Sequence, residues 1–108
     1  GNINIQRDWG WAEEYVEAMK LINSSNLNED FIICTGKLTK LEKIIDLAFR
    51  KFNLSWQDHI VIDKSLLRKQ EIAKSVGDPE HLKTTLKWEA KLKIEDIVEK
   101  LIDKKLNA

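Results

Sequence analysis

The stretch RDWGWAEEYVEAM, residues Arg7–Met19, decides how the rest of the chain is arranged. Its apolar residues recur at helical spacing, which predicts an amphipathic helix over residues 9–23. Asp8 suits the N-cap position of this helix, because its side chain can accept from the free backbone N–H groups of the first turn. Arg7 would then lie just outside a rigid element, at the mouth of any site there. On the pattern alone, a surface arginine before an ordinary helix is the simpler interpretation.

Length and composition indicate one small globular domain over residues 1–108. Hydrophobic residues make up 43% of the 108 residues and charged residues 33%, a balance typical of a folded protein. The formal net charge is zero, which argues against a nucleic-acid partner bound through a broad basic surface. No apolar run is long enough to span a membrane, and no signal peptide precedes the first motif. Cys34 is the only cysteine, so we expect a buried, reduced thiol in a cytoplasmic protein.

Short apolar runs predict two or three strands. Phe31–Cys34 is closed by Gly36 and indicates a buried strand, and residues 60–62 indicate a second. Residues 3–6 suit a short extended segment. The stretch from 65 to 76 is ambiguous, with a turn of helix expected near 71–75.

Three further helices follow from spacing and start signals. Thr39 begins a sequence with capping-box spacing before an apolar face that extends from Leu41 to Phe52. Asp78-Pro79 predicts the start of a short helix, with Asp at the N-cap and Pro at the first helical position. The last helix has a continuous apolar stripe from Ile94 to Ile102. The fold class is therefore α/β: a small, mostly helical domain with too little strand for a complete doubly wound sheet.

Few residues suit catalysis or cofactor binding. The four glycines, at positions 1, 10, 36 and 77, form no glycine-rich dinucleotide turn. His59 and His81 are far apart and have no cysteine partners, which gives a metal site little support. Tyr15, the only tyrosine, belongs to the apolar stripe of the first helix, and we interpret it as a core residue.

Arginine is used sparingly, which makes its positions informative. Only Arg7, Arg50 and Arg68 are arginine among 18 basic residues. Arginine offers a planar fork that grips phosphate oxygens in a bidentate way, whereas lysine suffices for a solvated charge. Arg50 lies near the end of the second predicted helix, where a dipole contact explains it. Arg7 and Arg68 lie outside the predicted helices and strands and are the better candidates for ligand contact.

Several collinear blocks resemble the GDP-mannose 4,6-dehydratases, a family of extended short-chain dehydrogenase/reductases. The resemblance covers essentially the whole chain, and the order of the blocks makes it specific although no single block is. The blocks are residues 1–10, 15–19, 29–36, 56–58 and 61–63, Arg68 with Glu71, and residues 77–79 and 86–88.

This resemblance implies that residues 1–108 are the C-terminal substrate-binding domain of a longer enzyme. The family converts GDP-mannose to GDP-4-keto-6-deoxymannose with NADP, by oxidation at C4, loss of water and reduction at C6. Its cofactor domain and its Tyr-x-x-x-Lys pair have no counterpart here, since Met19 stands four places after Tyr15. We therefore expect this chain alone to be inactive, and the full-length protein to be a cytoplasmic homo-oligomer.

The resemblance also assigns three binding residues. Arg7 and Arg68 match the family's two arginines that contact the diphosphate of the nucleotide sugar, and Glu71 matches the glutamate that contacts its ribose. From the residues alone, Glu71 would be an exposed helix glutamate. Lys69 and Gln70 stand where the family has a proline and a small residue, so this loop lacks the stiffening that a proline gives.

Two other functions stay open from the sequence. Another sugar-nucleotide enzyme of the same superfamily, such as a 4-keto-reductase or an epimerase, would differ in base specificity. A free-standing interaction module without a ligand would have no coding sequence upstream. We also expect apolar surface near the ligand cleft that a partner domain would cover, with Trp9, Trp11 and residues 3–5 as candidates.

Overall fold

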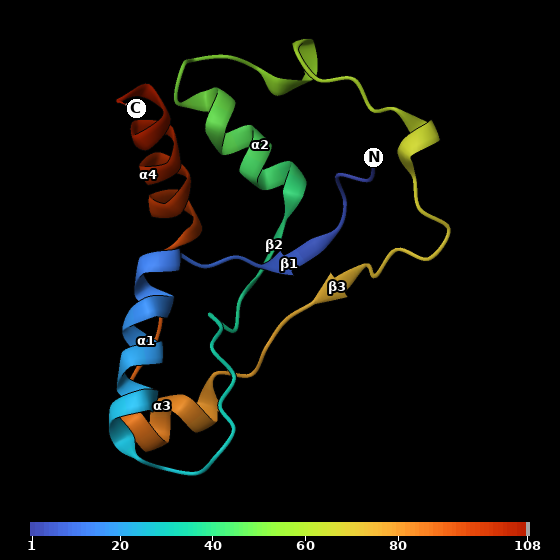
Figure 1. Cartoon of the computed structure of the whole chain (residues 1–108). Helices are drawn as coiled ribbons and strands as arrows, with labels where there is room; N and C mark the ends of the chain where they lie inside the picture. Colours follow the sequence, from blue (N-terminus) through green and yellow to red (C-terminus); the bar gives the residue numbers. More distant parts are fainter. Residues whose placement is uncertain (108) are drawn as a thin grey trace.

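Three short strands lie at the middle of the molecule, with two helices at each end (Figure 1). The computed structural model describes residues 1–107. The strands are β1 (Gln6–Asp8), β2 (Leu38–Lys40) and β3 (Lys74–Ser75). Helices α1 (Ala12–Ser25) and α3 (Glu80–Leu86) lie together at one end, and α2 (Leu41–Arg50) and α4 (Ile94–Leu106) at the other. Two short 3-10 turns, η1 (Trp56–Asp58) and η2 (Lys64–Leu66), interrupt the long connection from α2 to β3.

The sheet has the strand order β2-β1-β3. β1 is antiparallel to β2, with Arg7 opposite Thr39, and parallel to β3, with Arg7 opposite Ser75. The central strand thus has both its edges paired, although β3 is only two residues long. The extended segment expected at residues 3–6 is wrong in its position, because residues 3 and 4 form a turn and β1 shares only Gln6 with that range.

Both predicted hydrophobic strands are wrong. Residues 31–34 are irregular, because the side chains of this segment pack on the helical core instead of its backbone pairing with a strand. Residues 60–62 are also irregular, and Val61 is 91% exposed. The turn of helix expected near 71–75 is wrong as well, since β3 forms there. Cys34 is buried, as expected, and burial raises the pKa of its thiol.

The first helix begins later than the sequence indicates. Trp11 occupies the N-cap position of α1, with extended backbone and no side-chain cap, and the helix continues to Ser25. The prediction of Asp8 as the N-cap is wrong because β1 extends through Asp8 and places its carboxylate against other segments.

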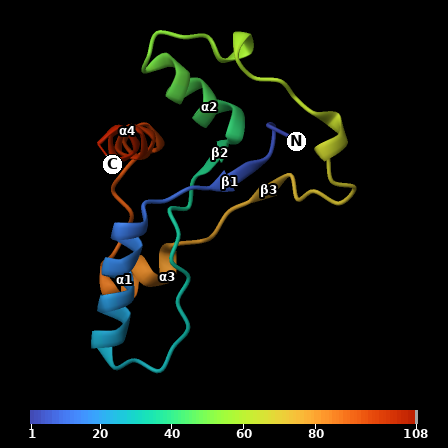
Figure 2. The same cartoon turned by 45° about the horizontal axis from the view of Figure 1, so that its top comes forward.

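The main core forms where α1 and α3 pack together (Figure 2). Ala18 of α1, Leu82 of α3 and Trp88 are its buried members. Tyr15 packs against this core with its ring edge-on to Trp88, at 6.1 Å between ring centroids. This confirms the prediction that Tyr15 is a core residue, and burial raises its pKa to about 12.

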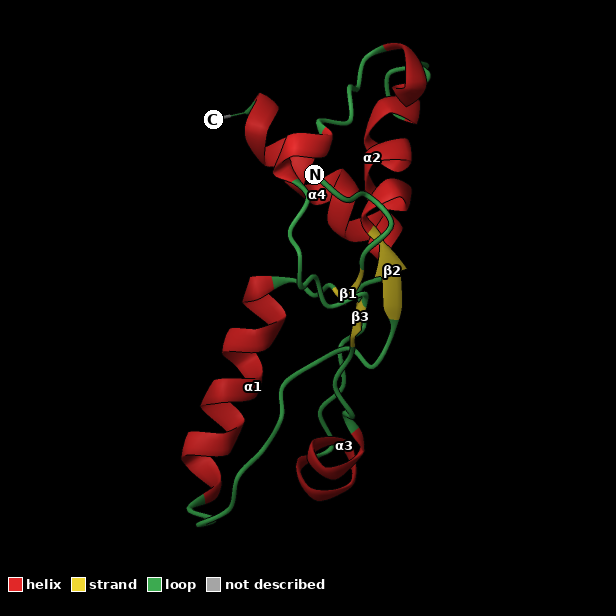
Figure 3. Ribbon diagram, turned by 90° about the vertical axis from the view of Figure 1, so that its right-hand side faces the viewer, coloured by secondary structure: helices red, strands yellow, loops and turns green. Residues whose placement is uncertain are grey.

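Helices α2 and α4 form the second packed pair, as Figure 3 shows from the side. Ile97 and Val98 of α4 are buried, which confirms its apolar stripe. Thr39 does not cap α2, because it lies in β2 and Lys40 occupies the N-cap position.

The prediction of Asp78 as the N-cap of α3 is wrong by one residue, because Pro79 occupies the N-cap position, without a side-chain cap, and the helix begins at Glu80. The Oδ1 of Asp78 accepts from the backbone N–H of Glu80 at 3.0 Å. Across residues 1–107, no helix combines the length and the apolar character needed to cross a membrane.

Trp11 joins the two ends of the molecule and is only 8% exposed. The expectation that it lies on the exposed surface is therefore wrong. Its indole N–H donates to Glu13, whose carboxylate also accepts from Lys104 of α4 at 2.7 Å. The Lys104 Nζ lies 4.9 Å from the centroid of the Trp11 ring, a cation–π distance. The hydrogen bond from Lys104, and after it the hydrogen bond from Trp11, lower the pKa of Glu13.

Candidate functional site

A polar hollow of about 470 Å³ opens beside β1 and brings all three predicted binding residues together. Arg7 and Trp9 come from β1 and the residue after it, while Arg68 and Glu71 come from the segment that leads into β3. The other lining residues are Gly1, Asn2, Ile5 and Leu66.

Arg7 is held in place from both of its sides. As the middle residue of β1, it has backbone partners in both neighbouring strands. Its Nη1 donates to the carbonyl oxygen of Gln6 at 2.9 Å, and its Nη2 donates to Glu71 Oε1 at 3.1 Å. A guanidinium carries five N–H donors, so three remain for a ligand. The side chain is 27% exposed, which leaves it reachable from the hollow.

Arg68 is the more exposed of the two arginines, with 81% of its side chain accessible to solvent. Its Nε lies 3.9 Å from Glu71 Oε2, which is an ion-pair distance but too long for a hydrogen bond. An exposed pair at this distance contributes little to stability. Arg68 is therefore free to turn its guanidinium toward a ligand at low cost.

Glu71 stands between the two arginines and is 22% exposed. The prediction from the residues alone, an exposed helix glutamate, is wrong, because the segment is irregular and its carboxylate faces Arg7. Two guanidiniums and one carboxylate leave the hollow with a surplus of one positive charge. This arrangement suits an anionic ligand that also offers hydroxyl groups to a carboxylate.

Trp9 forms one wall of the hollow and is 38% exposed, which agrees with the expected exposure beside the cleft. Its indole Nε1 donates to the carbonyl oxygen of Thr39 at 3.3 Å, which fixes the ring against β2.

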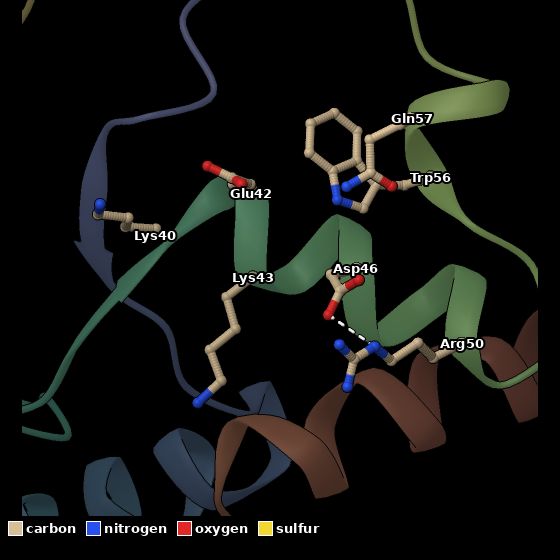
Figure 4. Close-up of a pocket in the computed structure, with 7 residues that line it drawn as sticks. All are labelled: Lys40, Glu42, Lys43, Asp46, Arg50, Trp56 and Gln57. Atoms are coloured by element: carbon tan, nitrogen blue, oxygen red, sulfur yellow. Dashed lines mark ion pairs between the residues drawn. The ribbon is translucent and has the colours of Figure 1, made fainter.

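Arg50 lies in a different hollow, of about 410 Å³, on the exposed side of α2 (Figure 4). Its Nε is 3.0 Å from Asp46 Oδ2, one helical turn earlier. Trp56 and Gln57 of η1 form the facing wall. The ion pair with Asp46 explains why an arginine stands at this position. Arg50 does not line the hollow that contains Arg7 and Arg68.

Asp8 is a further polar residue of this region whose role the sequence does not predict. Its Oδ1 accepts from both the backbone N–H and the hydroxyl of Thr35, at 3.0 and 2.5 Å. Its Oδ2 accepts from the backbone N–H groups of Gly36 at 2.8 Å and Gly77 at 3.4 Å. The residues that donate to Asp8 lie 27 to 69 positions away along the chain. The local sequence around Asp8 therefore gives no sign of these bonds.

Comparison with known proteins gives the family of this chain. The sequence model of the GDP-mannose 4,6 dehydratase family matches residues 1–101. The chain belongs to this family. GDP-mannose 4,6 dehydratase 1 of Arabidopsis thaliana is 35% identical over 106 residues, which are 98% of this chain and 29% of that protein. The Dictyostelium discoideum GDP-mannose 4,6 dehydratase is 29% identical over 121 residues, 96% of this chain and 34% of that protein.

The fold is shared with a solved structure described as RMD from Pseudomonas aeruginosa complexed with NADPH. The TM-score is 0.77 at 17% sequence identity, over 91% of this chain and 32% of that one. This likeness, together with the observed helices and short strands, confirms the expected α/β fold, mostly helical with little strand. The chain thus spans about a third of the length of the dehydratases and of the structure that it matches.

Proposed function

We propose that this chain holds the nucleotide end of GDP-mannose in a GDP-mannose 4,6-dehydratase, a lyase that forms GDP-4-keto-6-deoxymannose. One observation carries the proposal. A single hollow beside the sheet is lined by Arg7 and, from a segment far away in the sequence, by Arg68 and Glu71. Membership of the GDP-mannose 4,6 dehydratase family supports the choice of substrate.

The chemistry of the hollow suits a nucleoside diphosphate. Arg7 and Arg68 would grip the diphosphate oxygens with charge-assisted, bidentate hydrogen bonds. Glu71 would accept from the two ribose hydroxyls while keeping its bond to Arg7. Contacts remote from the sugar carbons would then position the sugar for reaction elsewhere in the enzyme.

The residues of this chain do not fit the NADP cofactor. A pyrophosphate site needs glycines whose backbone is open to a ligand, but three of the four glycines are covered by side chains. Positions 10, 36 and 77 have the side chains of Tyr15, Pro79 and Cys34 within 3 Å of where a β-carbon would stand. We therefore assign cofactor binding and the redox steps to the part of the enzyme outside this chain. We also propose that the full-length enzyme is a cytoplasmic homo-oligomer, with neither nucleic acid nor membrane as a partner.

The test is product analysis with the full-length protein, NADP and a set of sugar nucleotides. GDP-mannose should be converted to a 4-keto-6-deoxy product, while UDP- and dTDP-sugars should be left unchanged. An epimerised or reduced GDP-sugar as the main product would assign the chain to another enzyme of the superfamily. Absence of any turnover of GDP-sugars, in protein shown to be folded, would overturn the proposal.

A further inference from the structure

Asp8 connects three segments at one end of the small sheet. It follows Arg7 directly on β1, and its carboxylate accepts hydrogen bonds from Thr35, Gly36 and Gly77. Residues 35 and 36 lie just before β2, and Gly77 lies just after β3. One carboxylate therefore joins the central strand to the ends of both of its neighbours.

The attachment of β3 depends heavily on this junction. β3 has two residues, and its register with β1 consists of Gln6 opposite Lys74 and Arg7 opposite Ser75. The bond from Gly77 to Asp8 is long at 3.4 Å, but a second contact supports it. Cys34, which adjoins Thr35, is buried with its Sγ 2.6 Å from where a β-carbon on Gly77 would stand.

Arg68 and Glu71 lie in the segment between η2 and β3, and β3 fixes the C-terminal end of that segment. Glu71 is three residues before Lys74, and it meets Arg7 in the register that pairs Gln6 with Lys74. A shift of β3 by one residue would turn its side chains to the opposite face of the sheet. The geometry of the hollow thus follows from the position of β3.

We propose that Asp8 is a positioning residue of the nucleoside-diphosphate site, which acts through β3 to place Arg68 and Glu71 opposite Arg7. The inference rests on the proposed function of these three residues, and Asp8 itself does not line the hollow. It gives Asp8 a role in ligand affinity that is separate from its contribution to folding.

The chemistry at position 8 requires a carboxylate. Both oxygens accept, and every donor is an N–H or O–H group. Asparagine keeps the shape of the side chain but replaces one acceptor oxygen by an NH₂ group, which is a donor. This NH₂ group would face the donor groups of either Thr35 or the two glycines. Leaving such groups without acceptors is costly in a half-buried site, so Asp8→Asn should loosen one of the two neighbouring strands.

The test is a double-mutant cycle on the full-length protein, with GDP as the titrated ligand. Asp8→Asn and Arg68→Ala should each weaken GDP binding by roughly ten-fold. In the Asp8→Asn background, adding Arg68→Ala should cost less than about two-fold, because Arg68 is already misplaced. Thr35→Val removes the hydroxyl bond to Asp8 and the bond that this hydroxyl accepts from the backbone N–H of Lys37, but it keeps the backbone N–H bond from residue 35 to Asp8. It is the milder variant and should give a smaller loss in the same direction.

Hydrogen–deuterium exchange supplies a readout that needs no ligand. The backbone N–H of Gln6 donates to the carbonyl oxygen of Ala73 at 2.8 Å and so reports the pairing of β1 with the segment that enters β3. Asp8→Asn and Thr35→Val should speed exchange in residues 4–8 while α4 keeps its protection. Leu82→Ala is the stability-matched control: it should lower the melting temperature but leave both GDP affinity and the exchange of residues 4–8 unchanged.

Each outcome separates the two proposals. If GDP does not bind, or if Arg68→Ala binds like the wild type, the proposed function of the hollow fails. If Arg68→Ala weakens binding but the costs of Asp8→Asn and Arg68→Ala simply multiply, Asp8 acts independently and the positioning role is overturned. Unchanged exchange of residues 4–8 in Asp8→Asn would overturn it as well.

Discussion

Arg7 Nη2 lies 3.1 Å from Glu71 Oε1, so two residues 64 positions apart form the ion pair at the base of the hollow. The pair holds the Arg7 guanidinium in one orientation before any ligand arrives. A site organised in this way loses little conformational entropy on binding. Arg68, with its exposed side chain, would supply the second, adjustable contact.

Replacing Arg68 by alanine in the full-length protein should weaken GDP binding by roughly ten-fold or more, since a charged hydrogen bond contributes about 1.5 to 3 kcal/mol. Arg68→Lys should also cost affinity, because lysine keeps the charge but loses the planar fork. Calorimetric titration of GDP measures the effect, and thermal unfolding checks that the variants are folded.

Arg50→Ala is the matched control for this series. It removes an arginine of similar exposure whose partner is Asp46, in the separate hollow on α2 (Figure 4). Its GDP affinity should equal that of the wild type. If Arg50→Ala weakens binding as much as Arg68→Ala does, the loss reflects overall charge and not contact with the diphosphate.

The chain of 108 residues alone should turn over no sugar nucleotide. Three of its four glycines are covered by side chains, and its only tyrosine is packed in the core without a lysine four positions on. Incubation with GDP-mannose and NADP should leave the substrate unchanged by chromatography, with the full-length protein as the positive control. Conversion at the rate of the full-length enzyme would contradict the assignment of the redox steps to the part outside this chain.

Helix positions were largely predictable from the sequence, whereas the sheet was not. The apolar stripes of α2 and α4 are local signals, and both helices form where the spacing indicates. Strand pairing depends on distant partners, so the apolar run at 31–34 was mistaken for a strand when its side chains in fact pack on the helices. β3, with the polar residues Lys74 and Ser75, has no hydrophobic pattern by which it could have been found.

The candidate site followed from the resemblance more than from residue patterns. Scarce arginine pointed to Arg7 and Arg68, but nothing local separates Glu71 from the other acidic residues of the chain. Asp8 was misplaced because an aspartate before a helical stretch is a good N-cap in isolation. Its actual partners, Thr35 and Gly77, are brought to it only by the folded chain.

Gly10→Ala should destabilise the domain by roughly 1 to 3 kcal/mol, because the added methyl group overlaps a packed side chain. A β-carbon at position 10 would stand 2.1 Å from the hydroxyl oxygen of Tyr15 and 2.2 Å from its ring carbon. Denaturant unfolding measures the loss. In a Tyr15→Leu background the same substitution should cost clearly less, since the colliding atoms are gone. Equal costs in both backgrounds would show that the tyrosine is not what excludes a side chain there.

Tyr15 should titrate near pH 12 in the folded domain, against about 10 for an unperturbed tyrosine. Burial is the main cause, and the negative charge of Asp8 adds to it. Because the folded state keeps the neutral phenol while the unfolded state ionises first, the stability due to Tyr15 is complete below about pH 10 and is lost between about pH 10 and 12.

Tyr15 is the only tyrosine of the chain, so tyrosinate absorbance of the 108-residue domain reports this group alone. Circular dichroism over the same pH range identifies the point at which the fold is lost. Tyr15→Phe keeps the ring in the core and should show a shallower loss of stability over this range. A native midpoint near 10, with the fold intact, would mean that the phenol is solvated and not packed against Trp88.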